Sequence, residues 1–175
     1  ILLLMRSIKI VFVSVALVLC SSVAGFAQSE SVWFKRGYRG NVEFDAGATL
    51  SRTFIVSVLT SHGYSVGNGL YLGVGTGVTI NPNDRGYFVL PIFADMKYSF
   101  MDCACSPFLS MKMGTSFYME SVTAGFLLKP SVGVDVGNFS LHIGYGLHTG
   151  TEVIDVLQSE DYIKHSLTVG ASWWF

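Results

Sequence analysis

Apolar and polar residues alternate along most of this chain. In 138–148 the odd-numbered positions are all apolar or aromatic, and the even-numbered positions are serine, glycine, histidine or asparagine. A repeat of two residues is typical of a β-strand with one apolar face. The same pattern predicts strands at 40–50, 53–62, 69–80, 87–100, 107–118, 122–136, 138–148 and 164–175. Within this set, 53–62 alternates poorly, so its register is the least well defined.

The connections between these segments favour an all-β, up-and-down barrel of eight antiparallel strands. Short turns follow the second, fourth and sixth predicted strands. The turn after the sixth strand consists only of Gly137-Asn138. The longest connection is 149–164, which carries four acidic residues, Glu152, Asp155, Glu160 and Asp161. Short turns at one end and a long loop at the other suit a transmembrane barrel whose short turns lie in the periplasm.

Alternation alone does not say which face of the barrel points outward. A soluble, lipocalin-like barrel buries its apolar face, whereas a membrane barrel exposes it. Here the polar face is mostly glycine, serine and threonine, which would make a poor soluble exterior. Aromatic residues also gather near the strand ends, as in the two interfacial girdles of membrane barrels; they are Tyr87, Phe88, Tyr98, Phe100, Phe117, Tyr118, Trp173, Trp174 and Phe175. We therefore predict a transmembrane β-barrel.

Composition agrees with this prediction and excludes one class of partner. The sequence is 50% hydrophobic and 13% charged, with a mean hydropathy of +0.49. A formal net charge of −1 provides no basic stripe for phosphates, so we expect no nucleic-acid partner.

The N-terminal segment 1–27 has the organisation of a cleavable signal peptide. Arg6 and Lys9 precede an apolar stretch at 10–19, and small residues stand at Gly25 and Ala27, where we predict cleavage. Residues 1–4 before Met5 are interpreted as an upstream extension. One alternative is a transmembrane helix, but the apolar run is too short to cross a bilayer. The other is a lipoprotein signal at Cys20, but Leu19 is larger than the residue that such a signal has before its cysteine. The barrel domain is then 28–175.

Several charged residues fall on the predicted inward face of the barrel. An eight-stranded barrel has a lumen that side chains just fill, and buried charges persist there only when they are paired. We predict an interior ion-pair network that holds the barrel closed; the alternative is a proton or ion path through a wet lumen. The residues are Glu43, Asp45, Asp95, Lys97, Lys112, Lys129 and Asp135.

The histidines raise the question of catalysis. Ser140, His142, His148 and Glu152 could be arranged as a serine, histidine and acid set. Lipid A deacylases, however, place these groups on the lipid-facing surface, whereas Ser140 and His142 fall on the inward face. The His-x-Ser-Asn motif of those enzymes is also absent from this sequence. We predict no catalytic residues. His62 is expected to stabilise a turn through a hydrogen bond.

Two cysteines, Cys103 and Cys105, remain after the predicted cleavage, and both lie in a predicted periplasmic turn. An exported protein permits a disulfide there, although a bridge across one residue strains the geometry. The pair could also hold a soft metal, but we expect none because other ligands are not nearby.

The chain ends on Thr168-x-Gly170-x-x-Trp173-x-Phe175, which resembles the signal read by the bacterial barrel-assembly machinery. Residues 167, 169, 171, 173 and 175 would face lipid. With the stretches 37–48, 60–64, 68–78, 90–100, 106–114 and 129–137, the sequence resembles small outer-membrane β-barrel proteins of the OmpA/OmpX-like superfamily, in particular Bacteroidetes-type members.

The resemblance implies a location more strongly than an activity. It implies an outer-membrane monomer without a cofactor, in contact with lipid and lipopolysaccharide and assembled by the barrel-assembly machinery. A structural or surface-interaction role, adhesin-like, is expected. The alternatives are a lipid A modifying enzyme of deacylase or acyltransferase type and, less favoured, a narrow pore, because this scaffold hosts several functions.

Overall fold

The structure, a computed structural model, describes residues 32–50, 53–82, 84–119, 123–155 and 158–175. The predicted signal peptide and its upstream extension lie outside these residues. After a short 3-10 turn at Val32–Phe34, eight strands follow: β1 (Gly37–Thr49), β2 (Phe54–Ser65), β3 (Leu70–Asn81), β4 (Asp84–Ser99), β5 (Cys105–Tyr118), β6 (Thr123–Val136), β7 (Phe139–Asp155) and β8 (Gln158–Trp174). Helices able to cross a bilayer by length and hydropathy do not occur in the described ranges.

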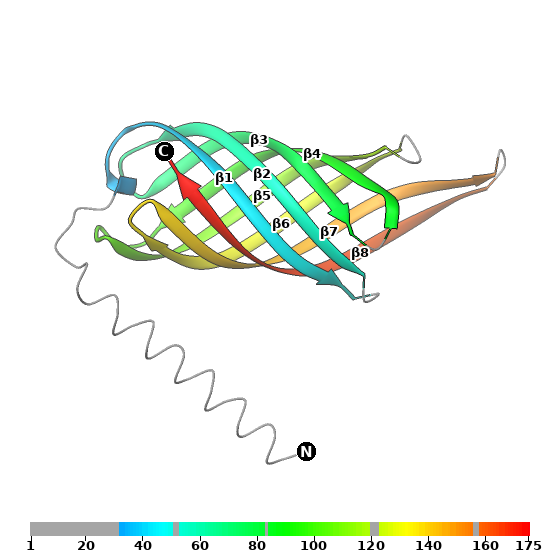
Figure 1. Cartoon of the computed structure of the whole chain (residues 1–175). Coiled ribbons are helices and arrows are strands. Elements are labelled where there is room, and N and C mark those ends of the chain that lie inside the picture. The colour runs from blue at the N-terminus through cyan, green and yellow to red at the C-terminus, as the bar shows by residue number, and fades with distance from the viewer. Residues whose placement is uncertain (1–31, 51–52, 83, 120–122, 156–157) are drawn as a thin grey trace, which may run out of the picture.

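The strands form a closed antiparallel barrel, as the alternation predicted. Each strand pairs with its neighbours in the sequence, and β8 pairs with β1 to close the ring (Figure 1). We call the end that holds the start of β1 and the end of β8 the terminal end. The opposite end, where β7 turns into β8, is the hairpin end.

The two faces of the barrel have opposite polarity. Outward positions are apolar and open, and the side chains of Phe44 and Val169 are 59% and 63% exposed. Inward positions carry serine, threonine and charged side chains, which are almost all buried. The barrel is therefore apolar outside and polar inside, the reverse of a soluble barrel.

Strand β2 shows why its alternation was weak. Ile55 and Leu59 are apolar but point into the lumen, where they are buried. Leu59 packs there with Phe93 and Leu127. An apolar layer inside the barrel thus interrupts the pattern, since both faces of β2 carry apolar residues at these positions.

The connection predicted at 149–164 is mostly strand, so that prediction was wrong. β7 and β8 pair with each other as far as Asp155 and Gln158, whereas the pairing of β6 with β7 reaches only His148. Beyond the barrel wall the two strands continue as a two-stranded ribbon, which Figure 1 shows projecting past the other strands. The acidic composition suggested a loop, but the segment also contains the β-branched residues that favour a paired ribbon.

At the terminal end, an aromatic cluster fills the lumen. Trp33 from the 3-10 turn, Tyr71 from β3 and Trp174 from β8 are buried together. The rings of Trp33 and Trp174 meet edge to face, with centroids 4.5 Å apart. The prediction that Trp174 and Tyr118 belong to the outer girdles is wrong: both side chains are buried, because they occupy inward positions of their strands.

The last residue closes the seam between β8 and β1. The backbones of Gly40 and Phe175 exchange two hydrogen bonds of 2.9 Å. A Cβ at Gly40 would lie 2.7 Å from the Phe175 ring. A glycine at this position therefore avoids a steric clash with the ring. As predicted, Leu167, Val169, Trp173 and Phe175 point outward.

Candidate functional site

The seven charged residues predicted for the interior all lie in the lumen, and each is at most 6% exposed. They divide into two groups. The central charge cluster contains Glu43, Asp45, Asp95, Lys112 and Lys129. The second group, nearer the terminal end, is the pair Lys97 and Asp135.

Strand register builds the central charge cluster. Lys112 on β5 lies directly opposite both Asp95 on β4 and Lys129 on β6, so two ammonium groups stand side by side. Glu43 reaches them from β1, across the lumen. Its Oε2 accepts a hydrogen bond of 2.8 Å from Lys112 Nζ, and its Oε1 accepts one of 3.0 Å from Lys129 Nζ. Like charges on adjacent strands repel, and the Glu43 carboxylate offsets that repulsion.

The remaining carboxylates complete the pairing. Lys129 also donates a hydrogen bond to Asp45, and Lys112 forms an ion pair of 3.8 Å with Asp95. Asp95 accepts a further hydrogen bond of 2.6 Å from the Ser61 hydroxyl. Each buried carboxylate therefore has a charged or hydrogen-bonding partner, as a buried charge requires.

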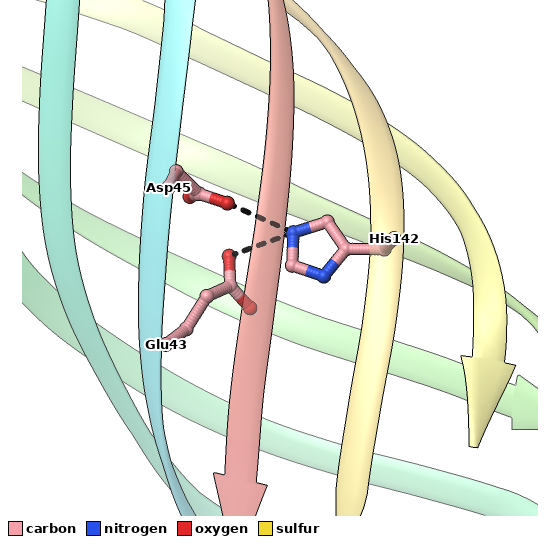
Figure 2. Close-up of side chains that lie close together, drawn as sticks. All are labelled: Glu43, Asp45 and His142. Atoms are coloured by element: carbon pink, nitrogen blue, oxygen red, sulfur yellow. Dashed lines mark hydrogen bonds and ion pairs between the residues drawn. The ribbon is translucent and has the colours of Figure 1, made fainter. Parts of the chain in front are cut away.

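His142 on β7 belongs to this cluster, although it was not among the predicted interior charges. Figure 2 shows its ring directed at Glu43 and Asp45. Its Nε2 lies 2.9 Å from Asp45 Oδ1 and 3.6 Å from Glu43 Oε1. The alternation places His142 on the inward face, but it does not predict its partner. Asp45 comes from β1 and contacts His142 only when the barrel closes.

Gly170 makes the contact between Asp45 and His142 possible. In register it lies between them, paired with Asp45 on one side and His142 on the other. A Cβ at this position would stand 2.0 Å from Asp45 Oδ1 and 2.6 Å from His142 Nε2. This residue of the predicted assembly signal thus also has a packing role in the lumen.

Glu43, Asp45 and His142 could each offer one ligand atom to a metal ion, with these atoms within 4.8 Å of one another. The two carboxylates, however, already accept hydrogen bonds from Lys112 and Lys129. A metal would have to displace an ammonium group from its partner. The arrangement is that of an ion-pair cluster, and its chemistry is the mutual neutralisation of buried charges.

Lys97 occupies an aromatic cage beside the central charge cluster. Its Nζ lies 3.7 Å from the ring centroid of Trp33, 4.1 Å from that of Phe108 and 4.4 Å from that of Trp174. A desolvated ammonium gains from such cation–π contacts. Nζ also donates a hydrogen bond of 2.5 Å to Asp135. Trp33 was missed from the sequence because it precedes the first strand and takes part in no alternation.

The side chains considered for catalysis are either hydrogen-bonded inside the lumen or distant from one another. Ser140 accepts hydrogen bonds from Lys97 Nζ and from the Trp174 indole. His148 lines the lumen wall of β7, and the side chain of Glu152 is outside the described set. His62 lies on the outer face, where its Nδ1 is 2.6 Å from the Tyr38 hydroxyl; it links two strands and does not stabilise a turn.

Cys103 lies in the connection between β4 and β5, Cys105 is the first residue of β5, and no disulfide joins the two in the structure. Cys103 Sγ donates a hydrogen bond of 2.6 Å to the carbonyl of Cys105. The disulfide stays a prediction. In the predicted assembly signal, Thr168 is buried in the lumen, whereas Trp173 and Phe175 are outside.

Comparison with known proteins gives a likeness of fold. No family model and no curated protein matches the sequence. Among solved structures, the outer-membrane enzyme PagL is 14% identical with a TM-score of 0.51, over 74% of this chain and 97% of that one. The N-terminal β-barrel domain of Pseudomonas aeruginosa OprF is 12% identical with a TM-score of 0.51, over 81% and 100%.

The chain has the fold of an outer-membrane β-barrel. At these identities the likeness concerns the fold alone, and functions must be argued from particular residues. The outer-membrane barrel fold accounts for both faces of the molecule: an apolar exterior and a polar lumen packed with paired charges.

Proposed function

We propose that this protein is an integral outer-membrane β-barrel with a structural or surface-interaction role. The observation that carries the proposal is the polarity of the barrel, with large apolar side chains exposed around its outside and charges sealed in its lumen. In water that exterior would expose far more contiguous apolar surface than a soluble monomer tolerates. In a bilayer the same surface is covered by lipid.

The packing of the lumen favours a structural role over a pore. Three layers fill it in the described residues: the aromatic cluster of Trp33, Tyr71 and Trp174, the central charge cluster, and the apolar layer of Leu59, Phe93 and Leu127. An eight-stranded barrel is narrow enough for side chains to fill. A permeation path would have to displace all three layers.

The same packing argues against the enzyme alternative. Ser140 and His142 are 1% and 5% exposed and point into the lumen, where an acyl chain in the bilayer cannot reach them. PagL is an enzyme by its name, but the likeness to it is one of fold. No observation in the described structure singles out a lipid A modifying site, so the proposal assigns no enzymatic activity and no cofactor.

The partners follow from the proposed location. Lipid and lipopolysaccharide would cover the apolar exterior, and the barrel-assembly machinery would insert the chain, probing the terminal motif around Trp173 and Phe175. The projecting ribbon of β7 and β8 would be the main extracellular surface of a monomer. Export through the signal peptide and membership of the OmpA/OmpX-like, Bacteroidetes-type group are part of the same proposal.

The orientation of the ribbon gives a direct test. A short epitope inserted between Asp155 and Gln158 should be labelled by antibody on intact cells. The same epitope inserted at Asn138, in the turn between β6 and β7, should be labelled only after the outer membrane is permeabilised. Labelling of both sites on intact cells, or of neither, would contradict the proposed orientation.

A further inference from the structure

The 3-10 turn at Val32–Phe34 precedes the barrel wall, and yet its middle side chain lies inside the lumen. Strand pairing begins at Gly37, whereas Trp33 is 1% exposed and packs against Tyr71 and Trp174. Figure 1 shows the turn at the terminal end of the barrel. We call Val32–Phe34 the strap, because it carries a large ring from outside the wall into the lumen.

The strap covers a small group of polar side chains. The ring of Trp33 lies over the ammonium group of Lys97, with 3.7 Å between Nζ and the ring centroid. Lys97 donates a hydrogen bond to Asp135, and Asp135 accepts another of 2.8 Å from the hydroxyl of Ser99. These three polar side chains are each at most 2% exposed. Trp33 thus separates a buried ion pair from the terminal end of the lumen.

Phe34 fixes the place where the strap meets the wall. Its side chain is partly buried against the aromatic cluster, and its ring would lie 3.3 Å from a Cβ at Gly69. The carbonyl of Gly69 accepts a hydrogen bond of 2.8 Å from the backbone N–H of Ser99. The strap therefore lies against the turn that is bonded to the end of β4, at the level of Ser99.

The contacts that hold the strap differ in kind from those that hold the wall. The Ser65 hydroxyl donates a hydrogen bond of 3.0 Å to the carbonyl of Trp33, and the ring contacts of Trp33 and Phe34 supply packing. The wall is a continuous backbone ladder, which joins β1 to β2 from Gly37 onward. An opening that breaks few backbone hydrogen bonds costs less free energy than global unfolding. The strap is therefore expected to leave the lumen while the wall stays closed.

We propose that the strap is a lid, and that its release opens a water-filled vestibule at the terminal end of the lumen. The space left by the Trp33 ring would hold several water molecules, and Ser99, Lys97 and Asp135 would offer them polar partners. The central charge cluster and the apolar layer behind it stay in place, so the lumen opens at one end only. The ion pair of Lys97 and Asp135 is accessible only in the open state. That this end faces the periplasm rests on the proposed function.

Thiol labelling tests the lid in a barrel whose strap is unchanged. Cys103 and Cys105 are first replaced with serine. A single cysteine is then introduced by Ser99→Cys, under the strap, or by Ser116→Cys, which is also fully buried but lies on β5 beyond Lys112, toward the hairpin end. Global unfolding exposes both thiols, whereas release of the strap exposes only the first. A water-soluble methanethiosulfonate should therefore label the Ser99→Cys protein faster, and equal rates would overturn the proposal.

Removing the ring of the strap gives the second arm of this experiment. Trp33→Ala should raise the labelling rate of the Ser99→Cys protein at least about tenfold and leave that of the Ser116→Cys protein unchanged. Trp173→Ala is the matched control, because this exposed tryptophan lies outside the barrel at the same end, and it should change neither rate. A rise at both positions would mean that the whole barrel is loosened. That result, or no rise at position 99, would contradict the lid.

Tryptophan fluorescence provides a measurement that needs no cysteine. The chain has three tryptophans, so Trp173→Phe combined with Trp33→Phe or with Trp33→Ala leaves Trp174 as the single fluorophore. Trp33→Phe keeps an aromatic ring beside Trp174, and Trp33→Ala removes it. Acrylamide should quench Trp174 more strongly in the alanine variant. Equal quenching in the two proteins would show that the ring of the strap does not keep water from the lumen.

Discussion

Replacing Glu43 with glutamine is expected to destabilise the barrel by about 3–5 kcal/mol, the cost of removing one partner from a buried ion pair. The side chain keeps its shape, but Lys112 and Lys129 lose the carboxylate that bridges them. Two adjacent ammonium groups would then stay buried side by side with only Asp45 and Asp95 as charged partners. The measurement is the urea unfolding curve of the refolded protein in lipid vesicles, followed by tryptophan fluorescence.

A second substitution distinguishes the lost pairing from a general defect. Lys112 has Glu43 as its hydrogen-bonding partner, so Glu43→Gln combined with Lys112→Met should lose less stability than the two single changes added together. Met113→Leu, next to Lys112 but on the outer face of β5, should change stability by less than about 0.5 kcal/mol. Strictly additive losses in the double variant would show that Glu43 and Lys112 do not act as a pair.

Gly170→Ala is expected to destabilise the purified barrel by about 1–3 kcal/mol, the usual cost of overpacking. The added Cβ would force Asp45 and His142 away from each other, and Asp45 is also held by Lys129. Combining Gly170→Ala with His142→Ala should recover part of the loss caused by crowding. The readout is the unfolding midpoint of protein refolded in detergent, without any assembly machinery.

This experiment separates two roles of one residue. If Gly170 served only as part of an assembly signal, Gly170→Ala would slow insertion in cells and leave the stability of refolded protein unchanged. Ala171→Val is the matched control, because position 171 is exposed on the outer face of the same strand. It adds bulk where lipid would accommodate it, so its unfolding midpoint should stay close to that of the original protein.

The strands could be predicted from the sequence because their physical cause is local. One apolar face toward lipid and one small or charged face toward the lumen force a repeat of two residues, and this alone placed Glu43, Asp95, Lys112 and Lys129 inside. The exception is instructive. Leu59 and Ile55 interrupt the pattern of β2 because both are buried on its inward face, where Leu59 belongs to an apolar layer within the lumen.

The contacts that close the barrel are not encoded locally, and they could not be predicted. Asp45 meets His142 only because β8 brings β1 and β7 together on either side of Gly170. Trp33 enters the lumen from outside any strand and covers Lys97. The ribbon formed by the ends of β7 and β8 has a different cause. Its acidic residues are typical of a loop, although pairing within a hairpin requires only a partner strand.

Heat-modifiable migration on gels would show whether this chain folds into a barrel embedded in the outer membrane. Outer-membrane fractions of expressing cells would be run with and without boiling. An integral barrel should give one band that changes its apparent mass on boiling and stays with the membrane after alkaline washing. A single band unaffected by boiling, or recovery of the protein in the soluble periplasmic fraction, would contradict it.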